Sequence, residues 1–271
     1  MTYLLYLGVG CIVGFFCGLL GLAGGVFIVP ALLLIFSVQG IPQEIAMQLA
    51  IATSLACLLV TSPASIYTHY QKHTIRWDLL HKLSPSVVLG ALMGGAFAVV
   101  ADSNLLQLLF GVFQVCIGTQ LLVGRLSVER TPQVSTGIMR LAGVILGILS
   151  ALLGIASSLT TSFLALAGVP MRNAIATATA IGFLIALFST VVYATFDRVQ
   201  GFAVDHTLGY IYLPALLGIA LTSIPAARCG SLLSQHISHQ RLRKAFGFIL
   251  LLLGCRFVWL HVTQYLSFLG Y

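Results

Sequence analysis

The stretch GLLGLAGGVFIVPALLLIF, residues 18–36, is apolar throughout, yet its middle holds the residues that an α-helix tolerates least. Gly21, Gly24 and Gly25 stand close together, and Pro30 follows them. The apolar run that contains this stretch, residues 2–36, would form a helix of roughly 50 Å, whereas the hydrocarbon core of a bilayer is about 30 Å thick. The glycines therefore predict a segment that breaks and turns back within a membrane.

Composition also places the chain in a membrane. The 271 residues are 59% hydrophobic and 7% charged, with a mean hydropathy of +1.06, whereas a soluble domain carries about 25% charged residues. The net charge of +7 does not indicate a nucleic-acid partner, because the basic residues of such a chain gather in cytoplasmic loops and set its orientation in the bilayer. We expect no cleavable signal peptide, because MTYLLYLG lacks a basic region.

Eight apolar segments separated by polar residues follow one another along the chain. They cover residues 2–36, 45–70, 79–101, 105–123, 137–167, 174–196, 208–227 and 245–266. The fifth segment resembles the first in being longer than one crossing requires.

The second half of the chain repeats motifs of the first half in the same order. LGLAGG (20–25) recurs as LGIASS (153–158), GIP (40–42) as GVP (168–170), and LAIATS (49–54) as NAIATA (173–178). The glycines at 10 and 14 recur at 143 and 147, and Phe110, Gly111 and Gly118 recur as Phe246, Gly247 and Gly254. These ordered matches predict a duplication, with one transmembrane repeat over residues 1–130 and a second over 131–271.

Basic residues indicate how the segments cross, because Lys and Arg gather in cytoplasmic loops. If all eight segments cross once, seven basic residues lie on one side and five on the other. If residues 137–167 enter and leave on the same side, the count becomes eleven against one, with only Arg198 in the minority. The charges therefore favour an even number of crossings for this segment, and the repeat extends that prediction to residues 2–36.

The expected fold class is an all-α polytopic membrane protein with two inverted repeats. Each repeat holds one broken, even-crossing helical element and three transmembrane helices, so the repeats have opposite orientations, as in many secondary transporters. Both termini are expected on the non-cytoplasmic side. Association into a homodimer stays open.

The two breaks form the core of the predicted binding site. Broken backbone at membrane depth must be buried in protein or line a wet cavity. Each second half-helix then presents N–H groups at the positive end of its dipole, which suits a small anion. Glycine at 24 and 25 lets a ligand approach closely, and the counterparts add hydroxyls: Ser157, Ser158, Thr160 and Thr161. Helix packing is the alternative, and it is the preferred explanation for the GxxxG glycines at 10, 14, 18, 143 and 147.

Further polar residues lie near the breaks in the second and sixth segments. Thr53, Ser54, Thr177 and Thr179 could supply hydroxyls, and Gln48 and Asn173 could donate amide hydrogens. The alternative is that the hydroxyls bond carbonyls of their own helix. Arg256, inside the eighth segment, either supplies a charge to the pathway or extends to the interface near Trp259.

Enzyme chemistry has little support in this sequence. It contains no HExxH, GxSxG or P-loop motif, and all six carboxylates fall in or beside loops. The histidine pairs 69/73 and 236/239 lack a further ligand nearby, so we expect no metal and no cofactor. The six cysteines form no CxxC motif and are interpreted as small buried hydrophobes.

LGLAGGVFIVPALL, GIP, LAIATS and HTIRWDLL (73–80), with the weaker second copy ending in FGFILLLLGCRF, resemble the sulfite exporter TauE/SafE family over nearly the whole chain. The resemblance implies a permease of the bacterial inner membrane for small anions, often sulfur-containing ones such as sulfite, sulfoacetate and other organosulfonates. The second copy departs from a glycine-rich break, because Ser157 and Ser158 stand there.

The predicted function is therefore secondary transport of a small oxyanion by alternating access, with the anion and the lipid bilayer as partners. An anion channel of the same fold is the alternative, and it predicts conductance instead of saturable exchange. An intramembrane enzyme would need a nucleophile and base or a metal set at membrane depth. A structural subunit would not need a symmetric pair of broken helices.

Overall fold

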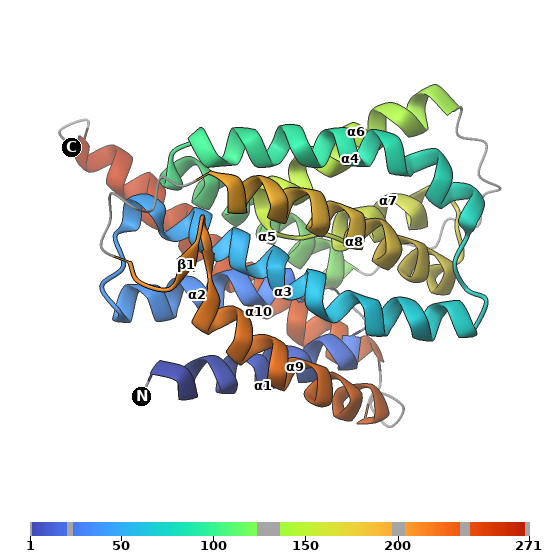
Figure 1. Ribbon diagram of the computed structural model, residues 1–271, viewed down its shortest axis with the longest axis horizontal. Helices are drawn as coiled ribbons and strands as arrows, with labels where there is room; N and C mark the ends of the chain where they lie inside the picture. The colour runs from blue at the N-terminus through green and yellow to red at the C-terminus, as the bar shows by residue number, and fades with distance from the viewer. Residues whose placement is uncertain (1, 21–23, 124–135, 197–203, 234–238, 269–271) are drawn as a thin grey trace.

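The computed structural model describes the chain apart from residues 1, 21–23, 124–135, 197–203, 234–238 and 269–271. Within the described residues it contains ten helices and one two-stranded ladder. The helices are α1 Thr2–Leu20, α2 Gly25–Val38, α3 Gln43–Gln71, α4 Trp77–Val100, α5 Ser103–Val123, α6 Thr136–Leu153, α7 Ser158–Leu166, α8 Met171–Thr195, α9 Leu213–Leu233 and α10 His239–Phe268. The strands β1 Thr207–Leu208 and β2 Ile211–Tyr212 lie between α8 and α9 (Figure 1).

The long helices are suited to a bilayer. Among the described residues, α3, α4, α5, α8 and residues 213–230 of α9 are long and apolar enough to cross a membrane. Large apolar side chains are exposed on their outer faces, such as Leu89, Met93 and Phe97 on α4. An exposed apolar surface of this kind suits contact with lipid.

Both long segments break at the positions predicted from the sequence. The first is divided into α1 and α2, and the second into α6 and α7. Gly154 ends α6 with a φ of +67°, the left-handed conformation that glycine adopts without strain. The N–H of Ile155 then bonds the carbonyl of Ser150 at 3.1 Å, which is the hydrogen bond of a Schellman cap.

The repeated GIP and GVP motifs end the two half-helices α2 and α7 in the same way. Gly40 and Gly168 have φ values of +73° and +84°. In both turns the following residue bonds back across the helix end at 3.0 Å, Ile41 N–H to Phe36 O and Val169 N–H to Leu164 O. The proline of each motif then precedes the next long helix, α3 or α8.

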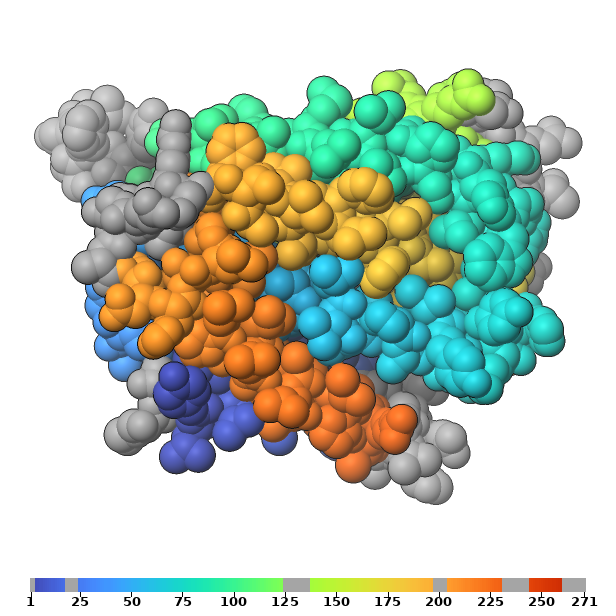
Figure 2. Space-filling view, viewed as in Figure 1, coloured from blue at the N-terminus to red at the C-terminus, as the bar shows by residue number. Residues whose placement is uncertain are grey.

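Helices from the two halves of the chain pack on one another. α1 packs on α9, α6 on α4, α3 on α8, and α5 on α10. Figure 2 shows α4, α8, α3 and α9 side by side across one face of the molecule.

Four of the GxxxG glycines lie in these helix contacts, as the packing interpretation predicts: Gly10, Gly14, Gly143 and Gly147. The surroundings of Gly18 fall outside the described residues. A Cβ at Gly14 would overlap the backbone of Ser223 on α9, and a Cβ at Gly147 would overlap the backbone of α4 at Val87.

Residues 208–212 correct the predicted start of the seventh segment. They form a short hairpin, with Leu208 paired to Ile211 and Gly209 at a φ of +55°, and α9 begins only at Leu213. Neighbouring elements satisfy the hairpin backbone, since the N–H of Tyr210 bonds the carbonyl of Tyr193 at 3.0 Å. These tertiary hydrogen bonds outweigh the helical preference of an apolar run.

The cysteine interpretation is correct only in part. Cys57 is buried, whereas Cys11, Cys116, Cys229 and Cys255 lie on exposed faces of their helices.

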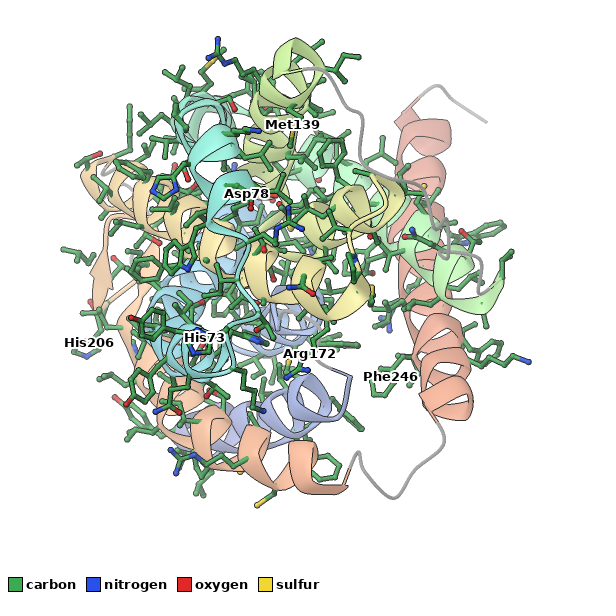
Figure 3. The ribbon with its side chains drawn as sticks, turned by 90° about the vertical axis from the view of Figure 1, so that its right-hand side faces the viewer. His73, Asp78, Met139, Arg172, His206 and Phe246 are labelled. Carbon is green, nitrogen blue, oxygen red and sulfur yellow. The ribbon has the colours of Figure 1, made fainter. Side chains whose placement is uncertain are left out.

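Charged residues divide between the two ends of the molecule. The basic end holds the α3–α4 connection, the starts of α6, α8 and α10, and the end of α9, with Lys72, Arg76, Lys82, Arg140, Arg172, Arg228 and Lys244 among its described residues. The acidic end holds Glu44, Asp102 and Asp205, and no described Lys or Arg. Figure 3 looks onto the basic end, where His73, Asp78 and Arg172 are labelled.

A hydrogen bond from Arg76 to Asp78 at the basic end raises the pKa of the arginine.

Candidate functional site

The two breaks meet inside the protein at Gly25 and Gly154. A Cβ on Gly25 would overlap the carbonyl oxygen of Gly154, and the hydroxyl of Ser54 donates to the same oxygen at 3.2 Å. Gly25 and Ser54 are both buried. The start of α2, the middle of α3 and the α6–α7 break therefore share one contact, and glycine at 25 is required by a neighbouring backbone.

The start of α2 has an unusual hydrogen-bond arrangement. Gly24 precedes the helix without any side-chain cap, and its carbonyl accepts from the N–H of Ile28 at 2.9 Å. Pro30 lies buried in the second turn and has no N–H, so it cannot bond the carbonyl of Val26. The side-chain amide of Gln114 on α5 donates to this carbonyl instead, at 3.1 Å.

Gln114 leaves one polar atom without a partner. The residue is 0% exposed, and its Oε1 has no hydrogen-bond partner. Buried polar atoms in folded proteins are nearly always paired, so such an atom is uncommon.

The start of α7 carries two more buried groups of this kind. Ser157 precedes the helix with no side-chain cap. The hydroxyls of Ser158 and Thr160, which are 6% and 0% exposed, have no hydrogen-bond partner. Thr161 differs, because its hydroxyl donates to the carbonyl of Ser157 at 2.9 Å.

α5 borders both half-helices. Gln114 reaches the first turn of α2, and six residues later Gln120 accepts a hydrogen bond of 3.5 Å from Ser162 on α7. Unpartnered polar atoms are thus buried at the beginning of α7 and beside the beginning of α2. No charged side chain is buried among the described residues, so any ligand there would meet neutral donors and acceptors.

Thr53 and Thr177 make matching contacts at opposite ends of the molecule. The hydroxyl oxygen of Thr53 accepts from the N–H of Tyr212 in the hairpin, at 3.0 Å. The hydroxyl oxygen of Thr177 accepts from the N–H of Arg76 in the α3–α4 connection, also at 3.0 Å. Both threonines are 0% exposed. Each therefore holds a connection that belongs to the other half of the chain.

Three more predicted site residues form structural hydrogen bonds. Gln48 donates to the carbonyl of Ala101 and Asn173 to that of Thr74, both at 2.8 Å, so each fastens a neighbouring turn. Thr179 donates to Ile175 within its own helix at 2.8 Å, as the alternative interpretation has it. Arg256 lies on an exposed face of α10 and is not among the groups around the breaks.

A cavity of about 390 Å³ opens at the acidic end, between the start of α1, the α2–α3 turn and the hairpin. Its polar lining includes Tyr6, Gln39, Asp205 and Tyr212. Tyr6 donates to Gln39 Oε1 at 2.9 Å, while the buried Nε2 of Gln39 has no partner. Burial raises the pKa of Tyr212, so its hydroxyl stays protonated. The cavity therefore combines neutral tyrosine and amide groups with one carboxylate, Asp205. It adjoins Thr53 through Tyr212, whose N–H donates to the threonine hydroxyl oxygen.

Sequence reasoning missed Gln114 and Gly154 as parts of this site. Gln114 is an amide within an apolar segment, and a second signal was available in Pro30, which must leave a carbonyl without its helical partner. The proximity of Gln114 and Pro30 could not be inferred, because the two residues lie 84 positions apart on different helices. No cluster of three potential metal ligands occurs in the described part of the chain.

This multi-pass helical protein has two broken helices, and the second half of each, α2 or α7, begins in the protein interior. That is the architecture of a membrane transporter. The comparisons with known proteins agree. The sulfite exporter TauE/SafE family matches residues 6–257, and the chain belongs to this family. It is a membrane protein of a transporter family and not an enzyme.

Curated relatives from several organisms cover nearly the whole chain. A "Probable membrane transporter protein" of Haemophilus influenzae is 28% identical over 93% of this chain and 96% of its own length. One from Methanocaldococcus jannaschii is 29% identical over 91% of both chains, and one from Xylella fastidiosa is 26% identical over 93% and 94%. No solved structure matches the chain.

Proposed function

We propose that this protein is a secondary transporter of a small oxyanion, which binds where α2 and α7 begin. The observation that carries the proposal is the pair of half-helices that start inside the protein beside buried polar groups without partners, Gln114 Oε1 and the hydroxyls of Ser158 and Thr160. Helix N-termini and hydroxyls together replace the hydration that an anion loses on entry. The absence of buried charge among the described residues leaves recognition to these neutral groups.

Inverted repeats, residues 1–130 and 131–271, would provide alternating access to this site. Reciprocal contacts support the proposal: Gly10 faces Thr222 as Gly143 faces Ser86, and Gly14 faces Ser223 as Gly147 faces Val87. Each pair is related to the other by the offsets of the sequence repeat. The matching contacts of Thr53 and Thr177 follow the same rule. Rocking of one repeat against the other would then open each face in turn.

The proposed orientation places the basic end in the cytoplasm and both termini on the outside of the inner membrane. The support is the distribution of charge, since described Lys and Arg residues gather at the end that holds the α3–α4 connection. Alkaline phosphatase fused after Tyr271 should be active, and the same enzyme inserted in residues 234–238 should be inactive. The reverse pattern would contradict the orientation.

A sulfur-containing oxyanion such as sulfite or an organosulfonate is the proposed substrate class, because the family is described as sulfite exporters. Counterflow in proteoliposomes tests both substrate and mechanism: labelled sulfite should exchange saturably, with sulfate, sulfoacetate and acetate as competitors. Conductance without saturation or counterflow would favour the channel. No flux of any of these anions would remove the assignment and leave the fold unaffected.

A further inference from the structure

The amide of Gln114 has a fixed orientation. Its nitrogen must face the carbonyl of Val26, because two oxygens in that position would repel each other. The carbonyl in turn depends on this donor, since Pro30 has no N–H to offer. The oxygen Oε1 is therefore directed elsewhere, and it is buried without a partner.

The structural role of Gln114 explains its nitrogen but not its oxygen. The matching position in the second half of the chain is Leu250, which is 1% exposed, so an apolar side chain fills an equivalent place on α10. An acceptor that is buried and unpaired is costly. A ligand that donates a hydrogen bond to Oε1 would remove that cost.

The charge of the site limits which ligand can do so. No cationic side chain is buried among the described residues, and the available donors are neutral. The Born cost of burying an ion rises with the square of its charge, so a doubly charged oxyanion is disfavoured far more than a singly charged one. A singly protonated oxyanion carries one charge and, in its O–H, one donor.

We infer that the site takes an oxyanion in its singly charged, protonated form, and that Gln114 Oε1 accepts the hydrogen bond from that proton. The inference rests on the proposed function. The deprotonated oxygens of the ligand would accept hydrogen bonds from N–H groups in the first turns of α2 and α7. On α7 the hydroxyls of Ser158 and Thr160 would donate as well. Gln114 is then a specificity-determining residue that distinguishes hydrogen sulfite from sulfite dianion.

Counterflow in proteoliposomes across the second ionisation of sulfurous acid tests the charge state. The half-saturation concentration of total sulfite should rise about tenfold per pH unit above that ionisation, and stay constant when expressed as hydrogen sulfite. Methanesulfonate is singly charged at every pH used, so its half-saturation concentration should not follow this curve. Sulfate, a dianion, should compete poorly. A constant value for total sulfite, or equal use of sulfate, would overturn the inference.

Substitution of Gln114 tests the contact. Gln114→Leu should raise the half-saturation concentration for hydrogen sulfite about tenfold more than that for methanesulfonate, which has no O–H to donate. Equal changes for the two ions would show a structural role only, and would overturn the assignment of Gln114.

The variant Pro30→Ala separates the role of the Gln114 amide nitrogen from that of its oxygen. In Pro30→Ala, the new backbone N–H can bond the carbonyl of Val26, so Gln114→Leu added there removes little besides Oε1. The selective loss should persist in this double variant, and its disappearance would refute the role of Oε1. If the wild-type protein carries neither hydrogen sulfite nor methanesulfonate at any pH, the proposed function itself fails. If it carries hydrogen sulfite and methanesulfonate without distinction, only the present inference fails.

Discussion

Replacing Thr53 by Val should loosen the hairpin at the acidic end without loosening the α3–α4 connection at the basic end. Valine keeps the shape of threonine but offers no acceptor to the N–H of Tyr212, which now bonds the threonine oxygen at 3.0 Å. The reciprocal change, Thr177→Val, removes the acceptor of the Arg76 N–H, also at 3.0 Å. Each variant therefore affects one end of the molecule.

The size of the effect follows from the burial of the two contacts. Both threonines are 0% exposed, and the contacts themselves are partly buried. A partly buried N–H left without an acceptor costs about 1–2 kcal/mol, toward the lower part of the usual range. That free energy corresponds to roughly a 5- to 30-fold increase in the population of the opened connection.

Hydrogen exchange measured by mass spectrometry in detergent or nanodiscs resolves the two ends. Peptides that cover residues 204–213 should exchange about 5- to 30-fold faster in Thr53→Val, and peptides that cover 72–77 should do so in Thr177→Val. Thr179→Val is the matched control, because its hydroxyl bonds only Ile175 in the same helix. Unchanged exchange, or acceleration at both ends in each variant, would refute the reasoning.

The remaining predictions concern backbone geometry. Gly25→Ala should lower the Tm, because overlap of the new Cβ with the carbonyl of Gly154 costs about 1–3 kcal/mol. Gly8→Ala is the control and should not lower the Tm, because Gly8 has open space around it. Equal Tm values for the two variants would show that the breaks do not pack closely. His73 has a φ of +50°, so His73→Gly should be tolerated and His73→Val should lower the Tm by the equivalent of about 1–2 kcal/mol; the opposite order would contradict the left-handed turn.

The sequence was sufficient to predict where the chain breaks and which helices are long. Glycine at 24 and 25, and LGIASS in the second half, interrupt apolar runs that exceed one crossing, and the structure confirms both interruptions. These features follow from local backbone preferences and from the thickness of the bilayer, which act on neighbouring residues. The hairpin at 207–212 escaped prediction, because its backbone is satisfied by Tyr193 and Thr53, which are distant in sequence.

The candidate site also has one part that could be predicted from the sequence and one part that only the structure shows. Composition and motif positions predicted a site at Ser158 and the start of α2, since a break in a membrane helix exposes backbone whatever the rest of the chain does. The sequence could not distinguish Ser158, whose hydroxyl has no partner, from Thr53 and Ser54, whose hydroxyls hold the hairpin and the carbonyl of Gly154. A hydroxyl is identical in both cases until its neighbours are known.

The sequence by itself therefore determined the class of protein, the two breaks and the repeated order of motifs. Only the tertiary structure decided that Gly25 faces Gly154, that Arg256 lies on an outer face, and that Gln114 replaces the donor that Pro30 lacks. The physical reason is range: helix breaks and membrane segments depend on residues within one or two turns, whereas partners of buried polar atoms come from elements that are far apart in the chain and meet only on packing.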